Sequence, residues 1–201
     1  MDTLDAIYQR RAIKHYDPEH ELSAEEEKTL MEAAIQSPTS FNMQNWRFVL
    51  VKDKALRQQV REAAWDQAHI TDSSLLIVLC ADLKAYGDNP QRYWVNAPKE
   101  VGERLSGMMV PFYEGKDQLI RDEAMRSVGL AGQTIMLTAK AMGYDSCPMI
   151  GFDPYAVAKI INLPEDHTIG FIIVVGKRLS DAFAKPGQLP LEEVVITDKF
   201  E

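Results

Sequence analysis

The sequence predicts a three-layer α+β or α/β domain in which helices pack on a central sheet. Apolar runs of strand length, bounded by polar residues, recur at 46–53, 73–82 and 168–177. Helical patterns of apolar residues lie before and between these runs, at 23–37, 53–65 and 117–142. The 201 residues are 46% apolar and 26% charged, as is typical of a globular protein with a real core. We expect a single domain over 1–201, with a core at about 4–177 and a C-terminal extension at 178–201.

The first part of the chain is expected to hold two helices and a strand. Apolar residues three positions apart indicate a short helix at 3–9. Ser23 and Glu26 have the spacing of a capping box, so a second helix begins there. This helix ends before Pro38, because a residue that precedes proline disfavours the helical conformation. The strand at 46–53 follows.

The middle of the chain contains a helix, a strand and an irregular region. Residues 53–65 repeat apolar residues at a spacing of four, which indicates a helix. Residues 73–82 are apolar almost throughout, the pattern of a strand covered on both faces. Residues 82–116 contain three prolines and are the least regular part, with a short helix expected near 98–113. The aromatic and Met-rich side chains there form either a mobile cover over a site or an ordinary core helix.

The longest helical pattern spans 117–142, and Gly143 suits its C-terminal cap. Small residues lie in the middle of this helix, where Gly129 and Gly132 each cost about 1 kcal/mol relative to Ala. They either allow another helix or a ligand to approach, or they fill a tight core. An extended piece, a helix and a strand complete the core, at 144–149, 154–163 and 168–177. In the tail, the run QLPLEEVVI could add a strand.

Charge and composition exclude several classes of function. The net charge of −8 argues against a nucleic-acid binder, which needs a basic face. No apolar segment approaches the roughly 18 residues of a membrane span. The N-terminus lacks the layout of a signal peptide, so we expect a cytoplasmic protein. The two cysteines form no CxxC pair and the four histidines show no metal-ligand spacing, so neither a disulfide framework nor a metal site is expected.

The first stretch with chemical potential is RRAIKHY. Arg10, Arg11 and Lys14 place three positive charges in five positions of an acidic chain. A helical turn would put Arg10 and Lys14 on one face. Arginine and lysine are the usual pair for a phosphate group. The alternative is a solvated basic helix end that counters the helix dipole.

The second stretch is the loop SPTSFNMQNW. In an extended chain, Ser40, Asn42 and Gln44 would point the same way. Their donors and acceptors could then read the edge of a flat heterocycle. The alternative is that these residues satisfy the loop backbone and that Trp46 belongs to the core.

The third stretch is MIGFDP. Gly151 follows a strand, where a glycine lets a backbone N–H approach a ligand closely. The alternative is that Gly151 makes a turn and Asp153 caps the next helix. The chain has no dinucleotide fingerprint, P-loop or nucleophile elbow, and Cys147 is interpreted as a buried structural thiol. If the protein is an enzyme, we expect a cofactor to carry the difficult step.

Together these stretches resemble the nitroreductase family of FMN-dependent NAD(P)H oxidoreductases. The motifs that carry the resemblance occur in family order over residues 4–195: RRAIKHYD, SPTSFNMQNWRFVLV, CPMIGFDP, and VVGK with QLPLEEVV. The resemblance implies an α+β fold with a mixed or antiparallel sheet flanked by helices. It also implies a homodimer with FMN at its interface and a C-terminal tail exchanged with the dimer partner.

The resemblance also implies which residues bind FMN. The matched residues are Arg10, Arg11, Ala12, Lys14, Ser40, Asn42, Gln44, Gln67, Ile150, Gly151, Lys185 and Gln188. The first four match the positions that hold the phosphate and the N1/C2=O side of the flavin. The next three match a loop that meets the flavin ring from the other subunit. Gln67 matches a contact to the pyrimidine edge, and the backbone N–H groups of Ile150 and Gly151 match those that approach flavin N5 and O4.

The chain departs from the family pattern at three positions. Ala12 stands where serine is common, Asn45 where proline is usual, and Gln188 where arginine is usual. Lys185 is expected to replace that arginine as phosphate partner, with Lys177 as a further candidate. These departures affect phosphate binding and the loop, and leave the flavin-facing glycine in place.

The implied chemistry is ping-pong hydride transfer through flavin N5, with NADH or NADPH as donor and a nitroaromatic, quinone or related acceptor. A fixed cation at the N1/C2=O side, assigned to Lys14, would stabilise the negative charge that develops there. Two alternatives remain open at this point. One is a specialised family branch that cleaves flavin, dehalogenates or oxidises azolines, and the other is a non-catalytic FMN-binding protein.

Overall fold

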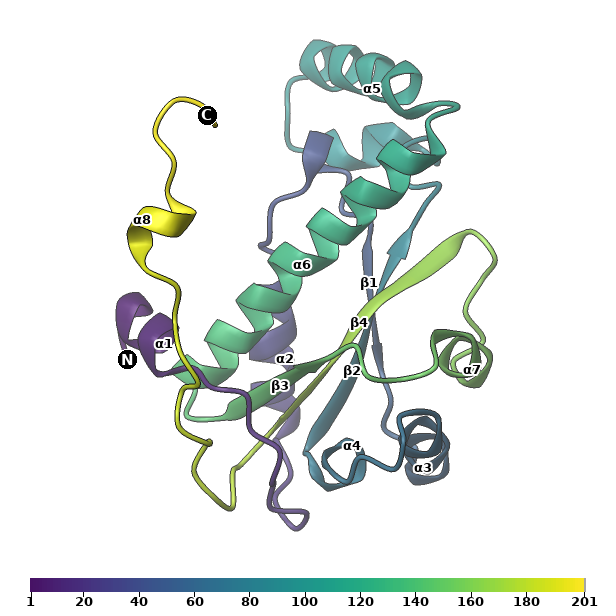
Figure 1. Ribbon diagram of the computed structural model, residues 1–201. Coiled ribbons are helices and arrows are strands. Elements are labelled where there is room, and N and C mark those ends of the chain that lie inside the picture. The colour runs from purple at the N-terminus through teal and green to yellow at the C-terminus, as the bar shows by residue number, and fades with distance from the viewer. Residues whose placement is uncertain (201) are drawn as a thin grey trace.

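The computed structural model describes residues 1–200 and has three layers, with helices on both faces of one sheet (Figure 1). The four strands lie in the order β1-β2-β4-β3, and all three pairings are antiparallel. Their bounds are β1 Trp46–Leu50, β2 Leu75–Asp82, β3 Asp145–Met149 and β4 His167–Gly176. The sheet is therefore antiparallel rather than mixed, and the only parallel pairing in the described chain is an isolated bridge between Ala12 and Ser146.

Both faces of the sheet are covered by helices. On one face lie α2 (Ala24–Ala34) and α6 (Asp117–Ala141). On the other lie α3 (Lys54–Ala63), α4 (His69–Asp72) and α7 (Pro154–Ile160). Along β2, alternate residues join the two hydrophobic clusters, and every residue of the strand is buried. This confirms the strand covered on both faces that the apolar run predicts.

Helix α6 crosses the sheet diagonally at very close range (Figure 1). A Cβ atom on Gly132 would overlap the ring of Phe171, and one on Gly170 would lie 2.5 Å from Cγ2 of Val128. The tight-core interpretation therefore holds at Gly132, whereas Gly129 faces open space. Gly143 has a φ of +88°, the left-handed conformation expected of the residue that caps the helix.

The region between β2 and α6 is more helical than its three prolines suggest. It contains a 3₁₀ turn, η2 (Pro90–Trp94), and a 15-residue helix, α5 (Lys99–Tyr113). A separate small cluster beneath α5 buries Met43, Tyr93 and Met109. These residues fit the interpretation of an ordinary core, while Met108 and Phe112 on the same helix remain exposed.

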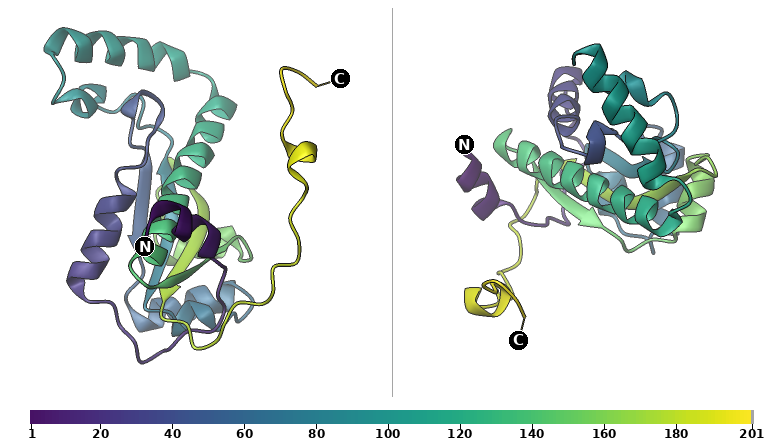
Figure 2. Two further views of the ribbon diagram at one scale, coloured as in Figure 1. Left: turned by 90° about the vertical axis from the view of Figure 1, so that its left-hand side faces the viewer. Right: turned by 90° about the horizontal axis from the view of Figure 1, so that it is seen from above.

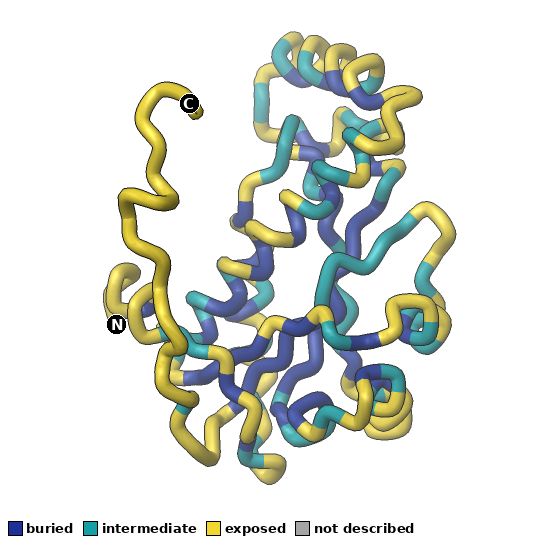
Figure 3. Tube along the Cα trace, viewed as in Figure 1, coloured by how far each residue is buried: buried dark blue, intermediate teal, exposed yellow. Residues whose placement is uncertain are grey.

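The two ends of the chain lie outside the sheet. Helix α1 (Thr3–Gln9) packs near the C-terminal end of α6. The tail stands away from the body and is exposed almost throughout (Figures 2 and 3). The expected strand in LPLEEVVI is instead a short helix, α8 (Leu191–Val194), because no sheet edge is paired with it within the single chain. Exchange of the tail with a partner stays a prediction.

Within residues 1–200, no helix combines the length and the apolar composition that crossing a membrane requires. The same residues contain no group of three or more His, Cys, Asp or Glu side chains placed to hold a metal ion.

Candidate functional site

The basic stretch runs as an extended segment beside β3. Helix α1 ends at Gln9, so the helical turn expected to align Arg10 with Lys14 does not form. Instead the backbone N–H of Ile13 donates to the carbonyl of Ser146 at 3.2 Å. Ile13 is buried while Lys14 is exposed. In an extended chain residues two apart share a side, so Arg10, Ala12 and Lys14 still share a face.

Lys14 and Arg10 place unpaired positive charge at β3. Burial raises the pKa of the Cys147 thiol, and the charges of Lys14 and Arg10 act to lower it. Burial lowers the pKa of His69, and Lys14 adds to this effect. His69 Nε2 lies 3.1 Å from the sulfur of Met149, the last residue of β3. Neither Arg10 nor Lys14 forms an ion pair with any described residue, so both cations are available to an anion.

The turn after β3 presents two free backbone donors. The amide nitrogens of Ile150 and Gly151 donate to no acceptor within residues 1–200, and Ile150 is 82% exposed. The carbonyl of Gly151 accepts from Nε2 of Gln67 at 2.8 Å, and the same nitrogen donates to the carbonyl of Ala64 at 3.0 Å. Gln67 thus fixes the peptide group that follows Gly151, next in the chain to the two peptide groups that carry the free donors.

Trp65 is a residue of this site that the sequence reasoning missed. A Cβ atom on Gly151 would lie 3.2 Å from Cζ3 of the indole, which is itself largely exposed. Trp65 and Asp66 both adopt positive φ, at 54° and 57°, so the chain turns sharply after α3. Consecutive non-glycine residues in the left-handed conformation are uncommon, and no local sequence pattern predicts them here.

The C-terminal tail contacts the basic stretch where it leaves the sheet: Leu179 N–H donates to the carbonyl of His15 at 3.0 Å, and Tyr16 forms an isolated antiparallel bridge with Arg178. Arg11 donates from Nη2 to the carbonyl of Phe183 at 2.5 Å. Lys185 and Gln188, further along the tail, are exposed and make no side-chain hydrogen bond or ion pair with a described residue. The structure therefore engages Arg11 with the tail, whereas Lys185 and Gln188 make no side-chain hydrogen bond with the other predicted phosphate partners.

The amide-rich loop does not have the extended shape that was expected. Its start forms a 3₁₀ turn, η1 (Ser40–Asn42), and φ is positive at Phe41, Asn42 and Gln44. Ser40 Oγ accepts from the hydroxyl of Tyr113 at 2.8 Å, and Asn42 Nδ2 donates to the carbonyl of Tyr93 at 2.7 Å.

The prediction that Ser40, Asn42 and Gln44 align through alternation is therefore wrong, because the loop turns on itself. The side chains of Ser40 and Asn42 form hydrogen bonds with other residues of the same chain. The side-chain amide of Gln44 makes no hydrogen bond with a described residue, so it alone of the three keeps all its donors and acceptors free. Trp46 is buried in the core, as the alternative interpretation held.

The two predicted halves of the site lie apart in the single chain. The amide loop adjoins the first half of α6, where the Ser40 N–H donates to Glu123 Oε1 at 3.4 Å. The basic segment adjoins the other end of the helix, near the 3.0 Å ion pair between Lys140 and Asp145 (Figure 1). A helix of 25 residues is about 37 Å long. One chain therefore does not bring the two halves together.

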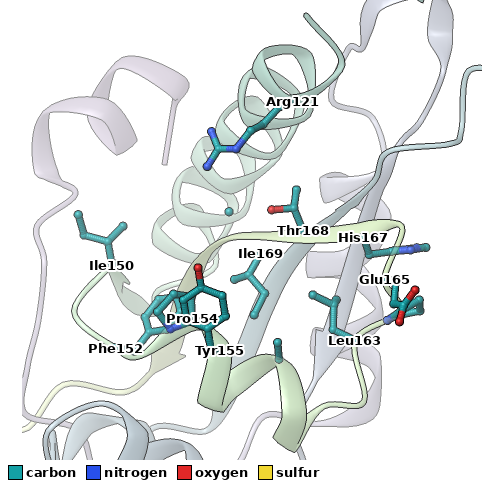
Figure 4. Close-up of a pocket in the computed structure, with 13 residues that line it drawn as sticks. Arg121, Ile150, Phe152, Pro154, Tyr155, Leu163, Glu165, His167, Thr168 and Ile169 are labelled. Carbon is teal, nitrogen blue, oxygen red and sulfur yellow. The ribbon is translucent and has the colours of Figure 1, made fainter. Parts of the chain in front are cut away.

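A cavity of about 750 Å³ opens beside the free donors (Figure 4). Its walls come from the turn after β3, from α7 and from the first half of β4, and α6 contributes one side chain above it. The principal lining residues are Arg121, Ile150, Phe152, Tyr155, Thr168 and Ile169. The sequence reasoning missed this cavity, because its walls meet only when α7 folds back along β4.

The comparisons with known proteins identify the family and the fold of this chain. The Nitroreductase family model matches residues 7–177. The chain belongs to the nitroreductase family. It is 55% identical over 204 residues to Protein DrgA of Synechocystis sp. (strain ATCC 27184 / PCC 6803 / Kazusa), covering 99% of this chain and 97% of that protein.

Two further family relatives connect this chain to cofactors. It is 32% identical to the protein named NADH dehydrogenase of Thermus thermophilus, covering 98% of this chain and 96% of that protein. A crystal structure from Exiguobacterium sibiricum 255-15, in complex with FMN, has a TM-score of 0.90 at 27% identity and covers 98% of this chain and 97% of that chain. The fold of this nitroreductase-family chain is thus shared with an FMN-bound structure.

Proposed function

We propose that this chain is an FMN-dependent NAD(P)H oxidoreductase that reduces nitroaromatic, quinone or related acceptors. One observation carries the proposal: two unpaired backbone donors, at Ile150 and Gly151, lie at the end of the strand beside which the unpaired cation Lys14 runs. Family membership and the FMN-bound structural relative support it.

The residues present fit an FMN molecule by the chemistry of their donors. Arg10 and Lys14 supply cations that form no ion pair within residues 1–200, and such cations suit the phosphate or the N1/C2=O side of the flavin. The amides of Ile150 and Gly151 supply neutral donors for N5 and O4, with Gln67 holding the Gly151 peptide in place. When bound, FMN supplies acceptance and release of hydride at N5.

The chain's own contribution is positioning and electrostatics. Lys14 would lie at the N1/C2=O side of bound FMN, where its positive charge would stabilise the negative charge that develops there. The two backbone amides would hold the N5/O4 edge of the flavin, and the cavity beside Ile150 would receive the acceptor. No side-chain nucleophile is required, which agrees with the buried, high-pKa thiol of Cys147.

A homodimer would complete the site. In a two-fold symmetric pair, antiparallel α6 helices would place the amide loop of one chain at the basic segment of the other. Exposed apolar side chains on α1 and α6 support such a contact: Leu4 is 63% exposed, Tyr8 73% and Leu130 49%. In this arrangement Gln44 supplies the amide that meets the flavin ring, and the tail crosses to the partner.

The purified protein tests the proposal directly. It should be yellow and contain on the order of one FMN per chain. Anaerobic titration with NADH and with NADPH should bleach the flavin, and a quinone or nitroaromatic should restore the colour. A colourless protein that fails to take up FMN contradicts the proposal. FMN bound without turnover would replace it with a non-catalytic FMN-binding role.

A further inference from the structure

We infer that the cavity beside Ile150 selects flat aromatic acceptors that carry a carboxylate, and that Arg121 is its specificity-determining residue. This inference rests on the proposed function, since it names the substrate class of the same site. The cavity lies next to the peptide that presents the free donors, so an acceptor in it adjoins the proposed flavin edge.

The body of the cavity is apolar and aromatic. Tyr155 and Ile150 are each 82% exposed, although both are side chains that water solvates poorly, and they form one wall (Figure 4). Phe152, beside Tyr155, and Ile169, on the far side of Tyr155 from Ile150, also line the cavity. Apolar side chains gathered around a concave surface favour an apolar ligand, and an aromatic wall favours a flat one.

Arg121 adds a charge that the chain leaves uncompensated. It comes from the first turns of α6 and reaches over the cavity from the side opposite α7 (Figure 4). It forms no hydrogen bond or ion pair with any described residue, whereas its neighbour Arg126, on the same helix, is paired with Glu123 at 3.3 Å. A guanidinium without a partner beside an apolar pocket matches a carboxylate on an apolar body.

The other polar groups of the cavity do not neutralise this charge. Glu165 and His167 line the far end from Arg121 in the same view (Figure 4), and His167 Nδ1 is engaged with Asp166 at 2.7 Å. The cavity is thus polarised along its length. Its positive end lies on the same side as Ile150, and its mixed end lies beyond Leu163.

A matched pair of acceptors tests the inference. We choose 4-nitrobenzoate and 4-nitrobenzamide, which share shape and differ in charge. Each reduction consumes one NAD(P)H and one proton and yields the nitroso product, NAD(P)⁺ and water. For each variant we divide kcat/KM for 4-nitrobenzoate by kcat/KM for 4-nitrobenzamide. The intrinsic difference in reactivity between the two acceptors is the same for every variant, so a change in this ratio reports on the protein alone. The variants are Arg121→Gln and, as control on the same helix, Arg126→Gln.

In Arg121→Gln, kcat/KM for 4-nitrobenzoate should fall about tenfold, as expected for a lost charge-assisted hydrogen bond. The value for 4-nitrobenzamide should stay within about twofold, and Arg126→Gln should change neither. Tyr155→Ala should weaken both acceptors alike. Equal losses for both acceptors in Arg121→Gln, or no loss, overturn the inference. So does a raised KM for NADH or NADPH with an unchanged acceptor ratio, since the guanidinium would then bind the donor.

Failure of the proposed function is distinguishable from failure of this inference. If neither acceptor is turned over, calorimetric titration of the purified protein still measures the affinity with which each of the two compounds binds. Tighter binding of 4-nitrobenzoate in the wild type than in Arg121→Gln supports the carboxylate site without any reaction. Equal binding of the two probes by the wild type contradicts it.

Discussion

The two halves of the predicted flavin site differ in how their polar groups are used. Around β3, the cations of Arg10 and Lys14 form no ion pair and the amides of Ile150 and Gly151 donate no hydrogen bond within residues 1–200. In the amide loop, Ser40 and Asn42 are already bonded to the region around α5. We therefore propose that the first half, called the receiving half below, binds a ligand, whereas Ser40 and Asn42 in the second half maintain the shape of the loop.

Replacing Lys14 should produce the largest effect, because it removes a ligand-directed charge and no internal contact. In Lys14→Met, the rate at which NADH bleaches the flavin should fall about 100-fold, as for loss of one preorganised stabilising group. Stopped-flow absorbance measures this rate. Lys159→Met, which changes an exposed lysine on α7, is the control and should leave the rate unchanged. An unaltered rate in Lys14→Met would remove the cation from the mechanism.

Replacing Gln67 should affect both stability and binding, because this side chain connects the core to the receiving half. Gln67→Met removes the hydrogen bonds to the carbonyls of Gly151 and Ala64. We expect the free energy of unfolding in urea to fall by about 1–2 kcal/mol. FMN affinity, measured by flavin fluorescence, should fall several-fold with it. Gln58→Met, on the exposed face of α3, should change neither. A loss of stability with full FMN affinity would mean that the Gly151 peptide needs no support.

Replacing Asn42, in contrast to Gln67, should lower the stability of the protein without weakening FMN binding. Asn42→Ala loses the hydrogen bond to Tyr93 and places alanine at a φ of 51°, which asparagine tolerates better. The free energy of unfolding should fall by about 1–2 kcal/mol. Asn42→Gly relieves the backbone and should recover part of the loss. If both variants instead keep full stability and lose FMN, Asn42 is a flavin contact and the distinction between the two halves fails.

The difference between the halves also shows what could be predicted from the sequence. The capping box at Ser23 and Glu26, the doubly covered β2 and the cap at Gly143 follow from local patterns, and all three are confirmed. The shape of the amide loop does not, because its positive φ values are maintained by contacts with Tyr93 and Tyr113, fifty or more residues away.

The same limit applies within the receiving half. The motif at Gly151 predicts a ligand-facing turn, but the hydrogen-bond partner of Gly151, Gln67, lies 84 residues earlier in the chain. Arg121 joins the cavity only because α6 crosses the sheet diagonally above β4. A helix pattern predicts which face of α6 is apolar, whereas it does not predict which exposed side chain will overhang a pocket built by other elements.

The smallest expected effect concerns a cluster outside both halves, and it checks that changes in stability do not by themselves alter the flavin site. Hydrogen bonds from Ser23, and then from Tyr144, lower the pKa of Glu26 to about 2 from its usual 4.5. Since the pKa is lower in the folded state, this stabilisation is present above about pH 4.5 and is lost as the pH falls from there toward 2.

Tyr144→Phe removes the 2.7 Å hydrogen bond from the Tyr144 hydroxyl to Glu26. It should therefore lower the free energy of unfolding slightly at pH 6, and by less at pH 3, when both are measured in urea. FMN content at neutral pH should be unchanged, because the cluster touches neither half of the site. A loss of flavin in Tyr144→Phe that matches the loss in Gln67→Met would show that the receiving half responds to stability in general. The Gln67 result would then no longer support a specific role in orienting the Gly151 peptide.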